Sequence, residues 1–180
     1  MSIENTRFNA LRNALYHTAR RLRFERLNRM LNFGVVMLGA AAIGDVFNYL
    51  NWPSNSLGIA VAMIGAAQLT FDFAGAARTH QQLQRDYYNL LAEIEAKIDP
   101  TDADDALWFS AMIRITGDEP PVMRAVDARA YNDAIGAMEW DEGERLVIPW
   151  WHRLFKNWCS FEGYHYEKVS EVEARKAAKQ

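Results

Sequence analysis

The apolar residues of this chain are concentrated in two uninterrupted runs, residues 30–50 and 57–77, each 21 residues long. Each run contains a single formally charged residue, Asp45 in the first and Asp72 in the second. A helix of this length spans about 31 Å, which matches a membrane hydrocarbon core of about 30 Å. The turn between the runs, NWPSNS, has the proline, asparagine and serine residues that are typical of a tight connection. The pattern predicts a transmembrane hairpin of two helices.

Amphipathic helices are predicted on either side of this hairpin. Residues 5–29 place apolar side chains at helical spacing, with Arg12 and other arginines on the remaining surface. After the second run, apolar residues recur every three or four positions up to Pro100, so we expect the second span to continue as one long helix out of the membrane. Further helices are predicted at residues 102–116, 120–138 and 150–169, the second of them with proline in its first turn.

The predicted fold class is an all-α membrane protein with a two-transmembrane helical hairpin. Its parts are a basic amphipathic cytoplasmic helix at residues 1–29, the hairpin at residues 30–77, a cytoplasmic extension of the second span at residues 78–100 and a small cytoplasmic helical region at residues 101–180. The alternative is a buried helical hairpin in a soluble all-α protein. A soluble core helix usually keeps a polar face, whereas both runs are apolar nearly all round, so the membrane interpretation is favoured.

Charged residues are distributed unevenly, although the net charge is only -3. Residues 1–29 contain seven arginines and two acids, whereas residues 99–144 contain twelve acids and three arginines. Arginines precede the first run and follow the second, and the connecting turn contains neither lysine nor arginine. Because basic residues accumulate on the cytoplasmic side of membrane proteins, both termini are expected in the cytoplasm.

One face of the predicted second helix carries small and polar residues, from Gly58 inside the second apolar run to Glu93 beyond it. An acid at the centre of a span costs about 2.5–3.5 kcal/mol, so this stripe is expected to face other helices or water. In a symmetric oligomer it would line a cation pathway. Alternatively, its glycines permit close helix packing and Asp72 pairs with a basic group such as Arg29 or Arg78. The candidate pore-lining residues are Asp45, Gly65, Gln68 and Asp72.

The arginines beside the membrane have three interpretations. They set the topology, attract anionic lipid head groups, or bind a phosphate-bearing ligand at the cytoplasmic mouth. A glycine-rich phosphate loop does not accompany them. The candidate ligand-binding residues are Arg20, Arg23, Arg26, Arg78 and Arg85.

Sequence motifs for catalysis and for metal binding are absent. The histidines are scattered, Cys159 is the only cysteine, and neither an HExxH nor a CxxC pattern occurs. No catalytic residue, metal or cofactor is therefore predicted, and we expect that the chain is not an enzyme. The tryptophan-rich segment after Pro149 is suited to stacking nucleobases, to lying at a membrane interface or to packing in a core, and core packing is the favoured interpretation.

The order of these parts resembles the SLATT superfamily, two-transmembrane effectors associated with nucleotide-signalling defence systems. The resemblance covers residues 10–100 and rests on the basic lead helix, the two spans with the NWPSNS turn, and the extension ARTHQQLQRDYYNLLAEIE. The tail VIPWWHRLFKNW is similar to the tails of some short members. The resemblance implies an oligomeric pore-forming or membrane-perturbing effector, controlled by a nucleotide or oligonucleotide from a nucleotidyltransferase encoded nearby.

The expected function is therefore an ion-channel-like effector of anti-phage defence in the bacterial inner membrane. It would act as a homo-oligomer, for example a tetramer, and would depolarise the infected cell. Three other functions are compatible with the same sequence: a non-conducting membrane anchor or scaffold, a holin-like membrane-lesion protein, and a fully soluble helical module.

Overall fold

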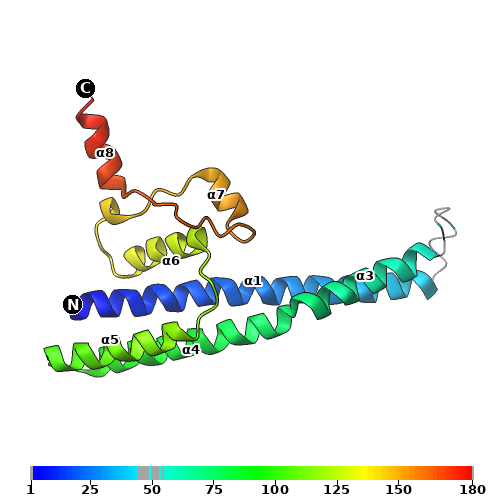
Figure 1. Cartoon of the computed structure of the whole chain (residues 1–180), viewed down its shortest axis with the longest axis horizontal. Helices are drawn as coiled ribbons and strands as arrows, with labels where there is room; N and C mark the ends of the chain where they lie inside the picture. Colours follow the sequence, from blue (N-terminus) through cyan, green and yellow to red (C-terminus); the bar gives the residue numbers. More distant parts are fainter. Residues whose placement is uncertain (1, 44–48, 50–52, 54, 180) are drawn as a thin grey trace. The chain divides into compact units, whose positions relative to one another are not determined.

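The computed structural model of the chain describes residues 2–43, 49, 53 and 55–179. These residues form helices and, apart from them, a single isolated antiparallel bridge between Leu146 and Lys168. The all-helical class predicted from the sequence is confirmed for this part of the chain. The elements, labelled in Figure 1, are α1 (Ile3–Ile43), α3 (Asn55–Phe71), α4 (Phe73–Ala96), α5 (Asp102–Gly117), α6 (Arg124–Ala137), η1 (Glu142–Glu144), α7 (Trp150–Phe155) and α8 (Val169–Ala177).

The chain divides into two compact units. Unit 1 comprises residues Met1–Arg20 and His80–Gln180, and unit 2 comprises residues Arg21–Thr79. Both α1 and α4 therefore contribute residues to each unit, although each is a single helix.

The first part of α1 is the centre of unit 1, where it packs against α4, α5 and α6 (Figure 1). Ala10 and Ala14 belong to one apolar cluster with Tyr87 of α4 and Trp108 of α5. Another face of α1 presents Phe8 to a second cluster that contains buried residues of α6. Because alanine side chains are small, they let the neighbouring helices approach α1 closely.

Polar contacts attach the same part of α1 to α5 and α6. Thr6 donates its hydroxyl to Asp105 Oδ1 at 2.5 Å, and both residues are buried. Arg12 donates from Nε to Asp127 Oδ1 at 2.8 Å, and a second guanidinium nitrogen contacts the other carboxylate oxygen. This paired geometry is the strongest form of an arginine–carboxylate contact. Arg12, which the sequence pattern placed on the surface, is thus a packing residue of unit 1.

The helix predicted at residues 120–138 begins later than expected, at Arg124. The prediction that a proline lies in the first turn is therefore wrong, because Pro120 and Pro121 both precede the helix. The backbone amides at its start make tertiary contacts instead: Met123 N donates to the Tyr16 hydroxyl at 3.0 Å, and Arg124 N donates to Ser160 O at 3.1 Å. Long-range hydrogen bonds therefore set this boundary.

The helix predicted at residues 150–169 is wrong beyond Phe155, where α7 ends. The chain then turns, with positive φ angles of 53° at Phe161 and 74° at Gly163, and pairs with residue 146 at Lys168. The segment folds back on itself so that the buried His152 stacks on Phe161, with ring centroids 3.8 Å apart. The residues that follow Lys168 form α8.

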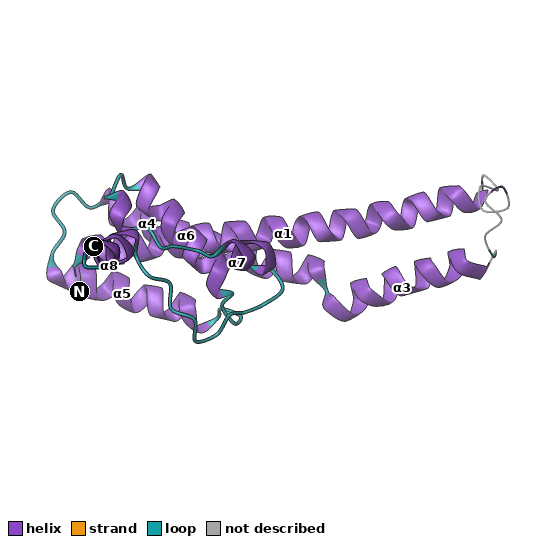
Figure 2. Cartoon of the chain, turned by 90° about the horizontal axis from the view of Figure 1, so that it is seen from above, coloured by secondary structure: helices purple, strands orange, loops and turns teal. Residues whose placement is uncertain are grey.

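Unit 2 is an antiparallel helical hairpin, in which the second part of α1 lies beside α3 and the start of α4 (Figure 2). In the contacting pairs, residue numbers increase along α1 as they decrease from α4 to α3, so the two helices are antiparallel. The contacting pairs are Phe24 with Phe73, Asn32 with Gln68, and Gly34 with Ile64.

Candidate functional site

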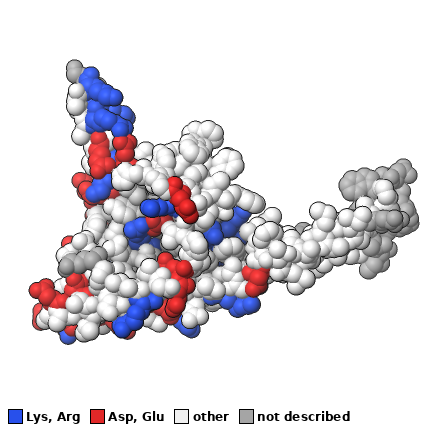
Figure 3. All heavy atoms as spheres, viewed as in Figure 1, with Lys and Arg blue, Asp and Glu red and all other residues white. Residues whose placement is uncertain are grey.

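Unit 2 exposes its apolar residues instead of burying them. Between residues 21 and 79, Ala77 is the only described hydrophobic residue that is buried. The described part of α1 after Arg29, and all of α3, carry no charged residue, as the white surface of the hairpin in Figure 3 shows. Large exposed apolar side chains on these two stretches include Met30, Phe33, Val36 and Met37 of α1 and Ile59, Met63, Leu69 and Phe71 of α3. A surface of this kind marks contact with lipid or with other protein chains.

One helical stretch among the described residues, Ser56–Ala96, is long and apolar enough to cross a membrane. The predicted first span, residues 30–50, runs past Ile43 into residues that lie outside this description. The structure thus supports membrane association through one candidate span.

A side-chain hydrogen bond joins the two helices of unit 2. Gln68 donates from Nε2 to Asn32 Oδ1 at 2.8 Å, which links α3 to α1. This hydrogen bond lies at the surface of the hairpin, beside its exposed apolar side chains. Hydrogen bonds of this type hold helices together where lipid supplies no hydrophobic driving force between them.

Asp72 ends α3 and caps α4. Its φ angle is 35°, in the left-handed region, which aspartate tolerates better than most residues. Its Oδ1 accepts a hydrogen bond from the backbone N–H of Gly75 at 2.9 Å, as an N-cap side chain does. A Cβ atom on Gly75 would lie 2.0 Å from Asp72 Oδ2, so glycine leaves the space that the carboxylate occupies. The long helix predicted from the second span is therefore present as the stretch Ser56–Ala96, with a local break between α3 and α4 at Asp72.

The other predicted pore-lining residues have different surroundings. Asp45 lies outside the described residues. A Cβ atom on Gly65 would meet no described atom within 4 Å, so this glycine presents an open helix surface. Gln68 contacts Asn32 across the hairpin. Arg29, one predicted partner of Asp72, instead pairs with Glu25 at 3.0 Å.

The five predicted ligand-binding arginines are divided between the two units. Arg20 and Arg85 belong to unit 1, and Arg23, Arg26 and Arg78 belong to unit 2. Arg20 and Arg23 are partly buried, whereas the other three are exposed.

A buried hydrogen-bond network in unit 1 was missed by sequence reasoning. The Nδ1 atoms of His17 and His80 are 2.8 Å apart, and His17 Nε2 lies 3.1 Å from Glu119 Oε1. Tyr87 donates its hydroxyl to the same carboxylate oxygen. Because a carboxylate only accepts, His17 donates from Nε2. The two Nδ1 atoms face each other, so one of them donates to the other.

Burial controls the protonation of this network. Burial, with repulsion from His17 and Arg20, lowers the pKa of His80 to about 3. Burial and the hydrogen bond to Glu119 raise the pKa of Tyr87. His17 is fully buried and His80 is 3% exposed, so a substrate cannot reach the pair in this conformation. The network is therefore a structural element that keeps His80 neutral at physiological pH.

The tryptophan-rich segment lies largely on the surface of unit 1. Trp150 is 75% exposed and Trp158 is 74% exposed, so core packing is the wrong interpretation for these residues. The buried member of the segment is His152, which contacts the Tyr166 hydroxyl through Nδ1 at 2.6 Å. The sequence pattern predicted buried tryptophans, whereas in the structure the histidine is buried and these two tryptophans are exposed.

Among the described residues, no group of three or more His, Cys, Asp or Glu side chains is placed to hold a metal ion. Comparisons of the chain with protein-family models, with curated proteins and with solved structures found no match.

Proposed function

We propose that this protein is a multi-pass membrane effector that assembles into an oligomeric, ion-conducting pore. The hairpin of residues 30–77 forms the membrane part, and unit 1 forms a helical part in the cytoplasm together with both termini. The observation that supports this proposal is the exposure of the large apolar side chains of unit 2, together with the Asn32–Gln68 hydrogen bond that joins its helices. A bilayer accounts for both features, because it covers the apolar surface and favours hydrogen bonds between helices.

The proposed pore requires several copies, because two helices cannot enclose a water-filled path. Gly65 gives α3 a surface without a side chain, which suits close packing against a helix of another copy. Asp72 Oδ1 is used in the helix cap, which leaves Oδ2 for solvent or a cation. A ring of such carboxylates, with Gln68 nearby and Asp45 toward the outer mouth, would favour cations.

The proposed control is a nucleotide or oligonucleotide made by a nearby nucleotidyltransferase, in an anti-phage system of the bacterial inner membrane. Its support is the resemblance of residues 10–100 to the SLATT superfamily. The exposed guanidinium groups of Arg26, Arg78 and Arg85, with Arg20 and Arg23, are suited to phosphate oxygens. Opening of the pore would depolarise the cell.

A second candidate function is a non-conducting membrane anchor. The observation that favours it is the cap at Asp72, since a carboxylate that starts a helix has a structural role without any ion path. A holin-like protein, by contrast, would form large holes that do not discriminate between ions and would need no ligand.

Ion flux from liposomes that contain the full-length protein tests the pore, with and without a panel of linear and cyclic nucleotides. We expect wild type to conduct cations in preference to anions, and Asp72→Asn to lower that preference severalfold. Asparagine keeps a side-chain oxygen for the cap, so this substitution removes the charge alone. Asp86→Asn, on the same helix but outside the apolar run, is the matched control. Absence of flux under every condition would favour the anchor, and unchanged ion preference would exclude the ring of acids.

A further inference from the structure

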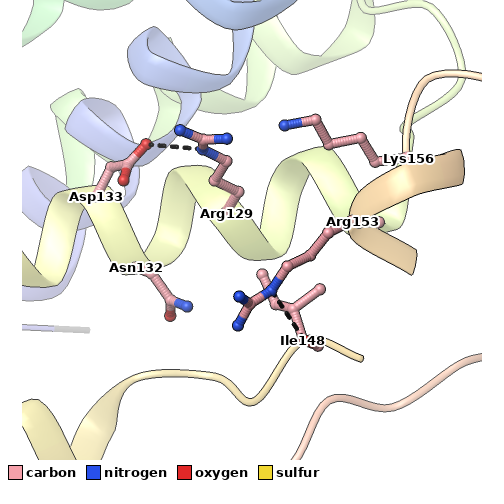
Figure 4. A pocket seen from close by; sticks show the side chains of 7 residues that line it. Arg129, Asn132, Asp133, Ile148, Arg153 and Lys156 are labelled. Carbon is pink, nitrogen blue, oxygen red and sulfur yellow. Dashed lines mark hydrogen bonds and ion pairs between the residues drawn. The ribbon is translucent and has the colours of Figure 1, made fainter. Parts of the chain in front are cut away.

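A cavity of about 390 Å³ lies in unit 1 between α6 and the residues from Ile148 to Lys156. Figure 4 shows that basic side chains from two separate segments reach it, Arg129 from α6 and Arg153 and Lys156 from the segment that contains α7. Among the described residues that line the cavity, Asp133 is the only acidic one. None of these residues belongs to the five arginines predicted from the sequence.

Hydrogen bonds hold the chain segments on both sides of the cavity. On α6, Asn132 accepts from Leu146 N at 2.7 Å and donates to Leu146 O at 2.9 Å, which holds the chain before Ile148 against the helix. On the opposite side, Arg153 donates from Nε to Ile148 O at 3.1 Å (Figure 4). This contact orients the Arg153 guanidinium and leaves its two terminal nitrogens for other acceptors.

Positive charge in this cavity exceeds negative charge. Arg129 Nε lies 3.8 Å from Asp133 Oδ2, a long and exposed ion pair. Within the described chain, Arg153 and Lys156 form no ion pair. Burial, and then repulsion from Arg129, lower the pKa of Lys156, although Asp133 acts in the opposite direction. An anion between these side chains would relieve this repulsion.

We propose that this cavity binds a phosphoryl group, with Arg129, Arg153 and Lys156 as its ligands. A phosphate monoester carries close to two negative charges and three acceptor oxygens, which matches three cations that are offset by one carboxylate. A carboxylate ligand has one charge and two oxygens, and would leave one cation without a partner.

The size and the apolar lining of the cavity indicate that the phosphate carries an organic group. Its volume lies within the range of about 300–1,000 Å³ that is typical of small-molecule sites and exceeds that of a phosphate ion. Ala125 and Ile148, both buried, supply apolar contacts beside the basic groups. The phosphoryl group can belong to a soluble nucleotide or to a phospholipid head group. The site itself does not depend on a pore, and only its role in gating rests on the proposed function.

A titration identifies whether the phosphoryl group belongs to a nucleotide or to a phospholipid. Full-length protein in detergent is titrated with two phosphate monoesters, adenosine monophosphate and a short-chain phosphatidic acid below its micelle concentration. Tighter binding of the first identifies a nucleotide site, and tighter binding of the second identifies a lipid site. Either result supports phosphoryl recognition. Failure of both probes to bind, or binding of acetate as tight as that of either probe, would overturn it.

Substitutions in the cavity test the ligands directly. Arg129→Gln, Arg153→Gln and Lys156→Gln should each weaken binding about tenfold, since each removes one charge-assisted hydrogen bond. Asp133→Asn should tighten binding severalfold, a gain that damage to the fold cannot produce.

Arg114→Gln, on α5 outside the cavity, is the matched control. Equal losses in Arg114→Gln and the three cavity variants, or weaker binding by Asp133→Asn, would contradict the site. Ligand binding by a protein that conducts no ions would support the site and contradict the pore alone.

Discussion

His17 and His80 are 63 positions apart in the sequence, and their imidazoles meet in the interior of unit 1 with Nδ1 atoms 2.8 Å apart. The antiparallel course of α1 and α4 brings them together. Once buried, the pair requires a defined set of tautomers, because Glu119 accepts from one end of it. Protonation of His80 would place a positive charge in this buried pair, which burial and the nearby Arg20 disfavour.

Acidification should therefore destabilise unit 1. The folded-state pKa of His80, about 3, lies below the unfolded value of 6.5, so between these values the unfolded chain binds a proton that the folded chain does not. Stability is fully present above pH 6.5 and falls below it by at most about 1.4 kcal/mol per pH unit. Thermal unfolding of the full-length protein between pH 7 and pH 5 measures this loss. His80→Gln should be less stable at pH 7 but should show a flatter pH dependence. Exposed His165→Gln is the control, and equal slopes in wild type and His80→Gln would contradict this assignment.

At the scale of helices, the junction between α3 and α4 combines a left-handed aspartate with a glycine three residues later. Asp72 supplies the cap and Gly75 supplies the space, so neither residue explains the junction without the other. Local sequence rules treat Asp72 as an unfavourable charge and Gly75 as a weak helix residue. The structure combines them into one helix start within an otherwise apolar segment.

The two residues should therefore be energetically coupled. Gly75→Ala places a Cβ against the Asp72 carboxylate and displaces the cap, a loss of about 1 kcal/mol. In an Asp72→Ala background there is no carboxylate to displace, and alanine is the better helix former by up to about 1 kcal/mol. A double-mutant cycle, measured by thermal unfolding in detergent, should give a coupling energy of about 1 kcal/mol or more. Additive effects would show that the hydrogen bond does not stabilise the junction.

At the scale of the whole chain, unit 1 is discontinuous in sequence. Residues 2–20 supply the helix around which residues 80–179 pack, and the hairpin of unit 2 is inserted between them. A natural consequence is that the N-terminal segment and the rest of unit 1 depend on each other for stability. The His17–His80 contact also shows that the chain leaves and re-enters unit 1 at neighbouring positions.

Replacing residues 21–79 by a short glycine-serine linker from Arg20 to His80 should give a folded protein that is soluble without detergent. The linker removes the exposed apolar helices and keeps every contact of unit 1. The matched comparison is a fragment of residues 80–180 alone, which should unfold or aggregate because Phe8, Ala10 and Ala14 are missing from its clusters. Circular dichroism and limited proteolysis of both proteins provide the measurement. Equal stability of the two would contradict the central role of the N-terminal helix.

The helical class and the antiparallel hairpin could be predicted from the sequence because they depend on local periodicity and on the length of apolar runs. The start of α5 was also readable, since Thr101 and Asp104 form a capping box three residues apart. The exposure of apolar residues in unit 2 follows from the same pattern, because a helix that is apolar all round has no polar face to turn toward water.

Only the tertiary structure determined which elements share a core and where charged groups meet. The N-terminal arginine helix looked like a membrane-flanking segment, but Arg12 contacts Asp127 across 115 positions. The early end of α7 and the basic cavity arise in the same way, from contacts between residues that are distant in the sequence. Such contacts leave no periodic signal, because the free energy that favours them comes from burial and hydrogen bonding that only the folded chain provides.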